Sequence, residues 1–203
     1  MLAAAARLAS GRRVGRAAPE AAGQTQRGRR DQLVARCGRW FSCSRAFGGL
    51  LTGPSPVDRS RTGSKHHLLV DATGIPLAVT LTGGNRHDVT QLLPLLDDLH
   101  ARPIKGKTGR PRQKPDQLLA DRGYDFDKYR RLLWARGIKP IIARRGIEHG
   151  SGLGKQRWVV ERAFAHLHHF RRLRIRYERD PVLHTALLML ACSILCWRRL
   201  SSL

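Results

Sequence analysis

The chain has 203 residues, enough for one substantial domain, and 38 Lys and Arg against 15 Asp and Glu give it a formal net charge of +23. Arginine occurs along the whole length, so we expect a polyanionic partner, although a GC-rich genome also enriches arginine, and RNA or anionic lipid would satisfy the same charge. The cysteines at 37, 43, 192 and 196 fit no zinc spacing, which favours reduced thiols in a cytoplasmic protein over a disulfide framework.

Residues 1–48 form a basic, low-complexity region, and we place a domain boundary between 48 and 49. Its first thirty residues combine Ala, Gly and Arg with almost no large apolar side chain, which is typical of a disordered basic extension and superficially of a transit peptide.

Two β-rich runs then follow, at 65–72 and 75–82, and the short glycine turn between them predicts an antiparallel hairpin. Leucines at helical spacing predict a helix over 89–100, with Asp88 placed to cap its first turn. A short strand at 117–120, a helix at 127–136 and a strand at 138–143 complete the middle of the chain.

Two further helices are predicted, at 155–172 and at 181–200. The second contains the apolar run 182–197, which is shorter than the roughly 20 residues that span a bilayer, so we expect a buried helix and no membrane partner. The order of elements predicts a mixed α/β fold, with antiparallel strands first and a parallel crossover later.

Asp121 follows the strand at 117–120 and precedes a glycine, at the carboxyl end of a strand, where α/β sheets gather ligands. A simple turn-forming role for this Asp fits equally well. Glu161 lies in an otherwise apolar and basic helix and shares a helical face with Arg157 and His168. An ion pair of Glu161 with Arg157 is the alternative to a ligand role, while two carboxylates brought together could hold Mg²⁺.

Several blocks of sequence, in matching order, resemble the insertion-sequence-five transposases of the DDE superfamily over about Gly53 to Leu200. The blocks are 53–60 (GPSPVDRS), 63–71 (GSKHHLLVD), 84–88 (GNRHD), 119–125 (LADRGYD), 142–146 (IARRG) and 157–162 (RWVVER).

The resemblance implies a ribonuclease-H-like α/β fold, a mixed sheet flanked by helices over 49–203, and metal-dependent DNA cleavage and strand transfer with Mg²⁺ or Mn²⁺. It implies that Asp121 and Glu161 are metal ligands, that Arg157 assists them, and that His168 replaces a lysine found in some relatives. A histidine contacts phosphate weakly unless it is protonated. No small-molecule substrate is implied.

The first aspartate of the family's triad is the departure. Relatives carry it on the leading strand, and alignment of that block onto 40–46 puts Trp40 at its position. Asp71, expected to be a turn residue, and Asp58 are weaker substitutes. An indole cannot bind Mg²⁺, so we expect impaired activity and a degenerate N-terminal stretch.

Other basic residues are candidates for the DNA backbone: Arg144 and Arg145 in a matching block, and Arg171, Arg172, Arg174 and Arg176 after the Glu161 helix. A solvated arginine face is the alternative for the last four, and His87 fits a loop-positioning role. We expect double-stranded DNA and further copies of the chain as partners, in the bacterial cytoplasm at the nucleoid. The rival functions are an inactive DNA-binding regulator of transposition and an RNA-associated basic protein.

Overall fold

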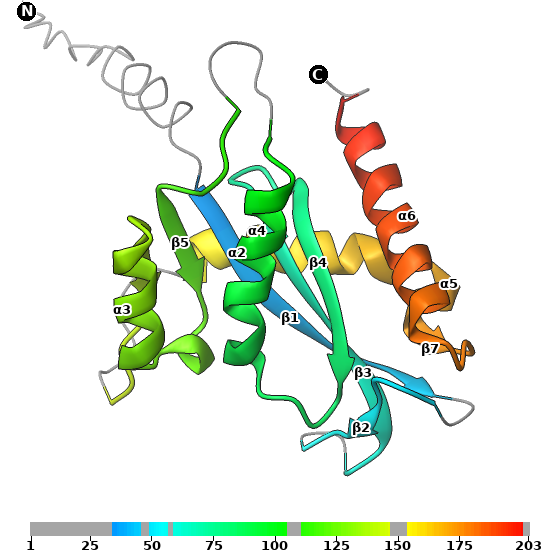
Figure 1. Ribbon diagram of the computed structural model, residues 1–203. Coiled ribbons are helices and arrows are strands. Elements are labelled where there is room, and N and C mark those ends of the chain that lie inside the picture. The colour runs from blue at the N-terminus through cyan, green and yellow to red at the C-terminus, as the bar shows by residue number, and fades with distance from the viewer. Residues whose placement is uncertain (1–33, 46–48, 57–58, 105–110, 147–153, 201–203) are drawn as a thin grey trace, which may run out of the picture. The chain divides into compact units, whose positions relative to one another are not determined.

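A mixed sheet is the centre of the molecule (Figure 1). The computed structural model describes residues 34–45, 49–56, 59–104, 111–146 and 154–200. The long strand β1 (Val34–Arg45) is hydrogen-bonded to β3 (Thr62–Val70) on one side and to β5 (Gln117–Ala120) on the other. The strand order is β2-β3-β1-β5-β6, with β4 also paired to β3 and β7 to β1.

The antiparallel part of the sheet comes first in the chain. Strand β3 pairs antiparallel with β4 (Pro76–Gly83), which confirms the predicted hairpin, and also with β1 and with the short β2 (Gly53–Pro54). At the hairpin turn the Asp71 Oδ1 atom accepts hydrogen bonds from the backbone N–H groups of Thr73 and Ile75, each at 2.8 Å. Asp71 is therefore the turn residue that the sequence predicts.

The parallel part follows. Strand β5 runs parallel to β1, and β6 (Lys139–Ile142) runs parallel to β5, with α3 (Asp127–Ala135) as the crossover between them. The predicted fold class, a mixed α/β sheet flanked by helices, is confirmed.

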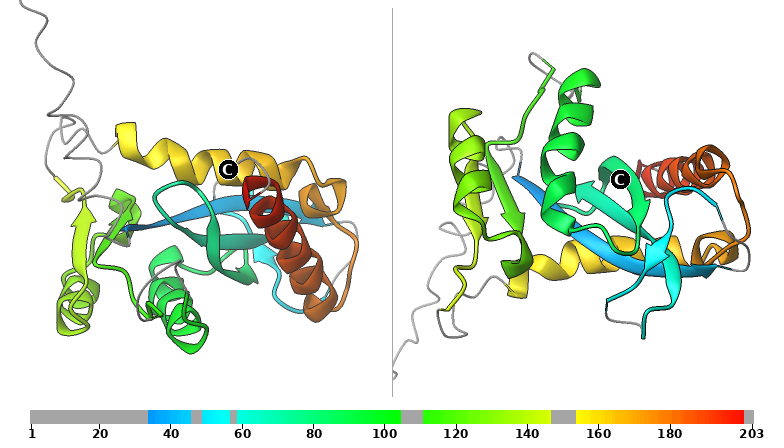
Figure 2. Two further views of the ribbon diagram at one scale, coloured as in Figure 1. Left: turned by 90° about the horizontal axis from the view of Figure 1, so that it is seen from above. Right: turned by 60° about the horizontal axis from the view of Figure 1, so that its bottom comes forward.

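Helices cover both faces of this sheet (Figure 2). On one face α2 (Leu92–Ala101) and α3 enclose an apolar core with Ala35 and Leu118. On the other face α4 (Gly154–His168) and α6 (Pro181–Leu200) enclose a second core with Leu68. The remaining short elements are η1 (Asp88–Gln91), η2 (Arg122–Tyr124), α5 (Arg171–Arg174) and β7 (Ile175–Arg176).

Three expectations need correction. The sheet takes β1 from within the region 1–48, so a boundary between 48 and 49 does not divide the described fold. Asp88 caps no helix: it begins the 3-10 turn η1, is buried, and pairs with Lys65 at 3.3 Å. The helix expected over 155–172 ends at His168, and the separate short helix α5 begins at Arg171.

The last helix, α6, was expected to be buried, and this is correct for only one of its faces. Leu188, Ala191 and Leu195 are buried, whereas Leu183, Leu190 and Trp197 are exposed. By length and composition alone α6 could cross a membrane, but the core helix of a soluble protein meets the same criterion. Its packing against α4 and β4 accounts for the apolar residues of its inner face.

Candidate active site and nucleic-acid interface

Asp121 lies directly after β5, at the carboxyl end of that strand. Leu118 and Ala120 point into the core under α2, and the backbone is still extended at Asp121 (φ −70°, ψ 161°). Because side chains alternate along an extended chain, Leu119 and Asp121 face the α4 side of the sheet. One carboxylate oxygen accepts a hydrogen bond from the Arg122 N–H at 2.6 Å, which caps η2, so the turn role and the position at the strand end coexist.

Glu161 is exposed on α4, beside the residues that attach this helix to β1. An ideal Cβ atom on Gly38 would lie 2.9 Å from Val160 Cγ2 and 3.3 Å from Phe164 Cε2, so α4 crosses β1 closely at Gly38. The parallel register of β1 and β5 pairs Arg36 with Leu119 and, continued by two residues, brings Gly38 level with Asp121. Glu161 and Asp121 therefore lie at the same level of the sheet.

The flanks of α4 separate Glu161 from α6. Arg162, Ala163 and His166 line a hollow with Leu195 and Arg199 of α6, which defines one flank. At about 100° per residue Glu161 and His168 fall on the opposite flank, and Arg157 holds the position one turn before Glu161. Helix α6 contacts β4, whereas β5 lies on the other side of β1. The flank of α4 that carries Glu161 therefore faces the side of Asp121.

His168 remains on the same flank as Glu161 and is partly buried. Its burial, together with the neighbouring Arg174 and His169, lowers the pKa of its imidazole. A neutral imidazole gives a phosphate one hydrogen-bond donor and no charge, so His168 is a weaker phosphate ligand than a lysine.

Strand β1, which pairs with β5 and lies against α4, contains no Asp or Glu. Gly38 is level with Asp121, and Trp40, the residue aligned with the family's first aspartate, lies two residues farther along, opposite His66. Among the described residues no three His, Cys, Asp or Glu side chains gather as metal ligands. Asp71 is engaged in its turn, and Asp58 lies outside the described residues.

The loop that carries Asp121 is held by a second acid that the sequence did not single out. The Asp125 carboxylate accepts hydrogen bonds from Arg130 Nε at 2.6 Å and from the Arg145 backbone N–H at 2.7 Å. Burial opposes ionisation of this carboxyl, but these bonds and the charges of Arg130 and Arg144 outweigh it, so the pKa of Asp125 lies below its ordinary value.

Both arginines of the 142–146 block contact this loop. The Arg145 guanidinium donates to the carbonyls of Arg122 and Gly123 and lies 4.1 Å over the Phe126 ring, while Arg144 pairs with Asp127 at 2.6 Å. His87 packs edge-on against Phe126, with ring centroids 5.3 Å apart, so it too packs against this loop. These contacts give Arg145 and His87 a positioning role for the turn that follows Asp121.

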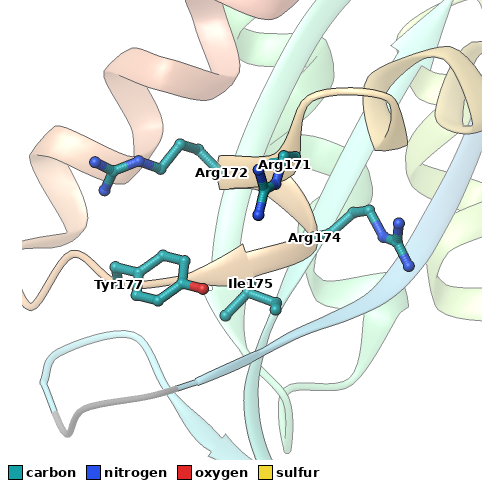
Figure 3. Close-up of a pocket in the computed structure, with 5 residues that line it drawn as sticks. All are labelled: Arg171, Arg172, Arg174, Ile175 and Tyr177. Atoms are coloured by element: carbon teal, nitrogen blue, oxygen red, sulfur yellow. The ribbon is translucent and has the colours of Figure 1, made fainter.

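A basic hollow lies beyond the end of α4. Arg171, Arg172 and Arg174 of α5 line it together with Ile175 and Tyr177, and its volume is about 630 Å³ (Figure 3). Glu178 holds Arg172 at 2.9 Å, and the Arg172 guanidinium carbon lies 5.6 Å from the centroid of the Tyr177 ring. Guanidinium groups beside an aromatic ring are suited to a phosphate backbone with its bases. Arg176, expected in the same basic ridge, is instead fully buried and donates to Ser64 Oγ at 2.7 Å, so it is no phosphate ligand.

Comparison with known proteins decides the family. Residues 51–196 match the family described as the transposase DDE domain. The chain belongs to this family. It is also 54% identical over 200 residues to a protein of Burkholderia cepacia named "Putative transposase for insertion sequence element IS402", covering 98% of this chain and 94% of that one. The catalytic core domain of BIV integrase is similar at 16% identity and a TM-score of 0.43, over 78% of this chain and 80% of that one.

The chain is thus an insertion-sequence transposase of the DDE type, as the motifs indicate, and cleavage and strand transfer of DNA are the general function of its family. The alignment with the Burkholderia protein extends into residues 1–48 as well as across the catalytic domain.

Proposed function

We propose that Asp121 and Glu161 together hold a divalent cation, Mg²⁺ or Mn²⁺, and that this pair is the chemical centre of DNA cleavage and strand transfer by the chain. The observation that carries the proposal is their common level: Asp121 ends β5 on the α4 side of the sheet, and Glu161 lies on the α4 flank that faces β5. Oxygen donors are the ligands that Mg²⁺ prefers, and the ion supplies charge that stabilises phosphoryl transfer.

The donor set fits one ion better than two. Mg²⁺ is commonly bound by one or two carboxylates and completes its shell with water and substrate phosphate. A pair of ions needs a further bridging oxygen, and β1 offers Gly38 and Trp40 at the relevant positions. We therefore infer impaired cleavage in this chain, with DNA binding retained.

The DNA is proposed to run from the two acids to the basic hollow of α5. Arg171, Arg172 and Arg174 would contact phosphates there. His168 lies on α4 between the hollow and the acids, and Arg157 lies one turn before Glu161, on the far side of the acids from the hollow. Arg144 and Arg145 would approach the backbone beside the Asp121 turn, in addition to their contacts within the protein. The substrate is double-stranded DNA at the element's ends and at the target, in the bacterial cytoplasm.

An inactive DNA-binding regulator is the second candidate, and the absence of an acid at Trp40 favours it. Such a protein would occupy element ends, or join oligomers of an intact relative, without cutting. Both candidates bind DNA, so cleavage has to be measured separately from binding.

A plasmid-nicking assay with Mg²⁺ or Mn²⁺ tests the site. We expect weak or undetectable nicking by the natural chain, and a rise of at least tenfold in Trp40→Asp. The change Gly38→Asp is unsuitable, because a Cβ at that position meets Val160. In the Trp40→Asp background, Asp121→Asn and Glu161→Gln should each abolish nicking, whereas Asp97→Asn, exposed on α2, should leave it unchanged.

Binding measurements separate the remaining outcomes. If Trp40→Asp does not nick while DNA binding is intact, the regulator is supported. If Asp121→Asn leaves both nicking and Mn²⁺ affinity unchanged, the proposed centre is wrong. If RNA competes more strongly than DNA for the chain, an RNA-associated role replaces the proposal.

A further inference from the structure

The outer face of α6 is apolar and uncovered within the described structure. The inner face packs through Leu188, Ala191 and Leu195, while Val182, Leu183, Leu190 and Trp197 on the outer face are 70, 58, 57 and 73% exposed. A contiguous exposed apolar surface of this kind marks an interaction site more often than a free surface.

The exposed positions follow a heptad pattern. Leu183, Ala186, Leu190, Ser193 and Trp197 are spaced by three, four, three and four residues, which places them in one stripe along α6. Side-chain size along this stripe is large, small, large, small, large, and therefore symmetric about Leu190. Such a stripe is complementary in shape to a second copy of itself that runs in the opposite direction.

A hollow beside the stripe supports the same pairing. Met189, Ser193 and Trp197 line it on the α6 side, Leu77 and Val79 of β4 line it on the other, and its volume is about 410 Å³. In an antiparallel pair centred on Leu190, this half of α6 lies against the amino-terminal half of the other copy. The protruding Val182 and Leu183 of the other copy would then reach the hollow.

The charges at the two ends of α6 also match. Asp180 precedes the helix and accepts a hydrogen bond from the Val182 N–H, and Arg198 and Arg199 stand in the last turn. In the antiparallel arrangement residue 180 of one copy lies opposite residue 200 of the other, near the exposed Arg198, while Arg199 faces the hollow shared with α4. Each end of the pair would therefore join Asp180 to Arg198, whereas a parallel pair would place Arg198 against Arg198.

We propose that the outer face of α6 is the surface by which two copies of this chain associate, through an antiparallel, two-fold pairing of α6 centred on Leu190. Figure 1 shows α6 at the opposite side of the sheet from α3, so the pairing leaves the β5 and β6 side of the molecule open. The pairing needs neither metal nor DNA and does not depend on the activity of the proposed centre.

The first test is the mass of the free protein by sedimentation equilibrium, without DNA. Because each copy carries a net charge of +23, about 0.5 M salt is needed to screen the repulsion between copies. We expect a dimer, and the change Leu190→Glu, which places two carboxylates at the two-fold axis, should weaken it by at least roughly thirtyfold. The matched control is Trp134→Glu, an exposed aromatic on α3, which should change the dimer constant by less than about threefold.

The second test is the direction of pairing, by disulfide formation in a Cys196→Ser background. Leu190→Cys should link to itself. Leu183→Cys and Trp197→Cys should not link when alone, because like positions are about 21 Å apart in the antiparallel pair, but should link when the two variants are mixed. Linking of Leu183→Cys to itself would indicate a parallel pair and overturn the proposal.

Other results also overturn it. A natural chain that stays monomeric at all concentrations, or a dimer that Leu190→Glu and Trp134→Glu weaken equally, excludes this surface. Binding of the natural chain to neutral phosphatidylcholine vesicles, lost in Leu190→Glu while the mass in solution stays that of a monomer, would assign the stripe to a membrane instead. None of these readouts measures nicking, so failure here is distinct from failure of the proposed centre.

Discussion

Asp125 fixes the loop beside Asp121 through charged hydrogen bonds. Its carboxylate is almost fully buried and joins Arg130 of α3 to the backbone of Arg145, twenty residues farther along the chain. A buried carboxylate with several donors is stabilised as the anion, which agrees with the lowered pKa of Asp125. The contact therefore contributes stability to the same turn that presents Asp121.

We predict that Asp125→Asn lowers the free energy of unfolding by about 2 to 3 kcal/mol at pH 7, because it leaves the partly buried Arg130 side chain without its anionic partner. Since the pKa of Asp125 is lowered in the folded state, its contribution is present above the ordinary pKa near 4 and disappears as the pH falls below it. Urea unfolding at pH 7 and pH 3 measures this. Asp127→Asn, whose acid is largely exposed, should cost less than about 0.5 kcal/mol.

Gly38 makes the close approach of α4 to β1 possible. A methyl group there would meet Val160, a β-branched side chain held in the core, so we predict that Gly38→Ala costs about 1 to 3 kcal/mol of unfolding free energy. Gly123→Ala is the control, because nothing lies within 4 Å of the position its Cβ would take. Equal urea midpoints for the two variants would contradict the close packing of α4 on β1.

The sequence singles out the two acids of the candidate site and indicates a loop-positioning role for His87, but it does not single out Asp125 or the positioning contacts of Arg145. Asp121 follows a buried strand and precedes glycine, and Glu161 stands four residues after Arg157 in a helix, so both carry a pattern. Arg145 acts through backbone carbonyls of Arg122 and Gly123, and such partners leave no signal in the side-chain sequence. The hydrogen bond from the Arg145 N–H to Asp125 joins residues twenty positions apart, and it forms only because β5 and β6 lie side by side.

At the scale of elements, alternation and leucine spacing were sufficient for the hairpin, β5, α3, β6 and α6, but not for β1. Arginines at 36, 39 and 45 interrupt its apolar residues, so it resembles the basic extension before it. Its place at the centre of the sheet arises from hydrogen bonds to strands on both sides, far apart in the sequence. Asp88 was misassigned because Lys65, its partner, is twenty-three residues away.

A pair of buried histidines joins α6 to the sheet. His66 of β3 and His184 of α6 approach at 3.0 Å between their Nε2 atoms, and His184 Nδ1 lies 3.1 Å from Glu178. When His184 Nδ1 carries a proton, it donates a hydrogen bond to Glu178. The His184 Nε2 atom can then accept a hydrogen bond from His66 Nε2, and both rings are neutral. Burial, with the positive potential of His184 and neighbouring groups, lowers the pKa of His66 to about 3.

We therefore predict that the protein loses stability as the pH falls below about 6.5, the ordinary pKa of histidine, because the unfolded chain then binds a proton that folded His66 rejects until about pH 3. His66 alone should reduce the free energy of unfolding by about 2 kcal/mol between pH 7 and pH 5. Urea titrations at both values should show a correspondingly smaller loss in His66→Gln. His100→Gln, exposed on α2, should keep the full loss, and the same loss in both variants would refute this account.

Across the part of the molecule that the structure describes, arginines differ in how far neighbouring acids neutralise them. On the side of α2, Arg136, Arg102 and Arg112 pair with Asp97, Asp98 and Asp116. Around α5, Glu178 pairs with Arg172, one of the three arginines that line the hollow. The net charge alone does not distinguish these sides, and the sequence could not either, because the pairing depends on which acids the fold brings to each arginine.

The uneven neutralisation predicts which arginines release counterions when DNA binds. An arginine that neutralises a phosphate steepens the fall of affinity with salt by about 0.9 in the log–log slope, whereas an arginine already neutralised by an aspartate contributes less. Replacing Arg171, Arg172 and Arg174 together by alanine should thus reduce the slope by about 2 to 3 and weaken binding to any duplex sequence. Replacing Arg102, Arg112 and Arg136 removes the same formal charge but should reduce the slope by less than about 1. Titration of a labelled duplex between about 0.05 and 0.2 M salt measures both slopes. Equal reductions would mean that DNA responds to the net charge of the chain, and that the hollow beside Tyr177 is not where the duplex lies.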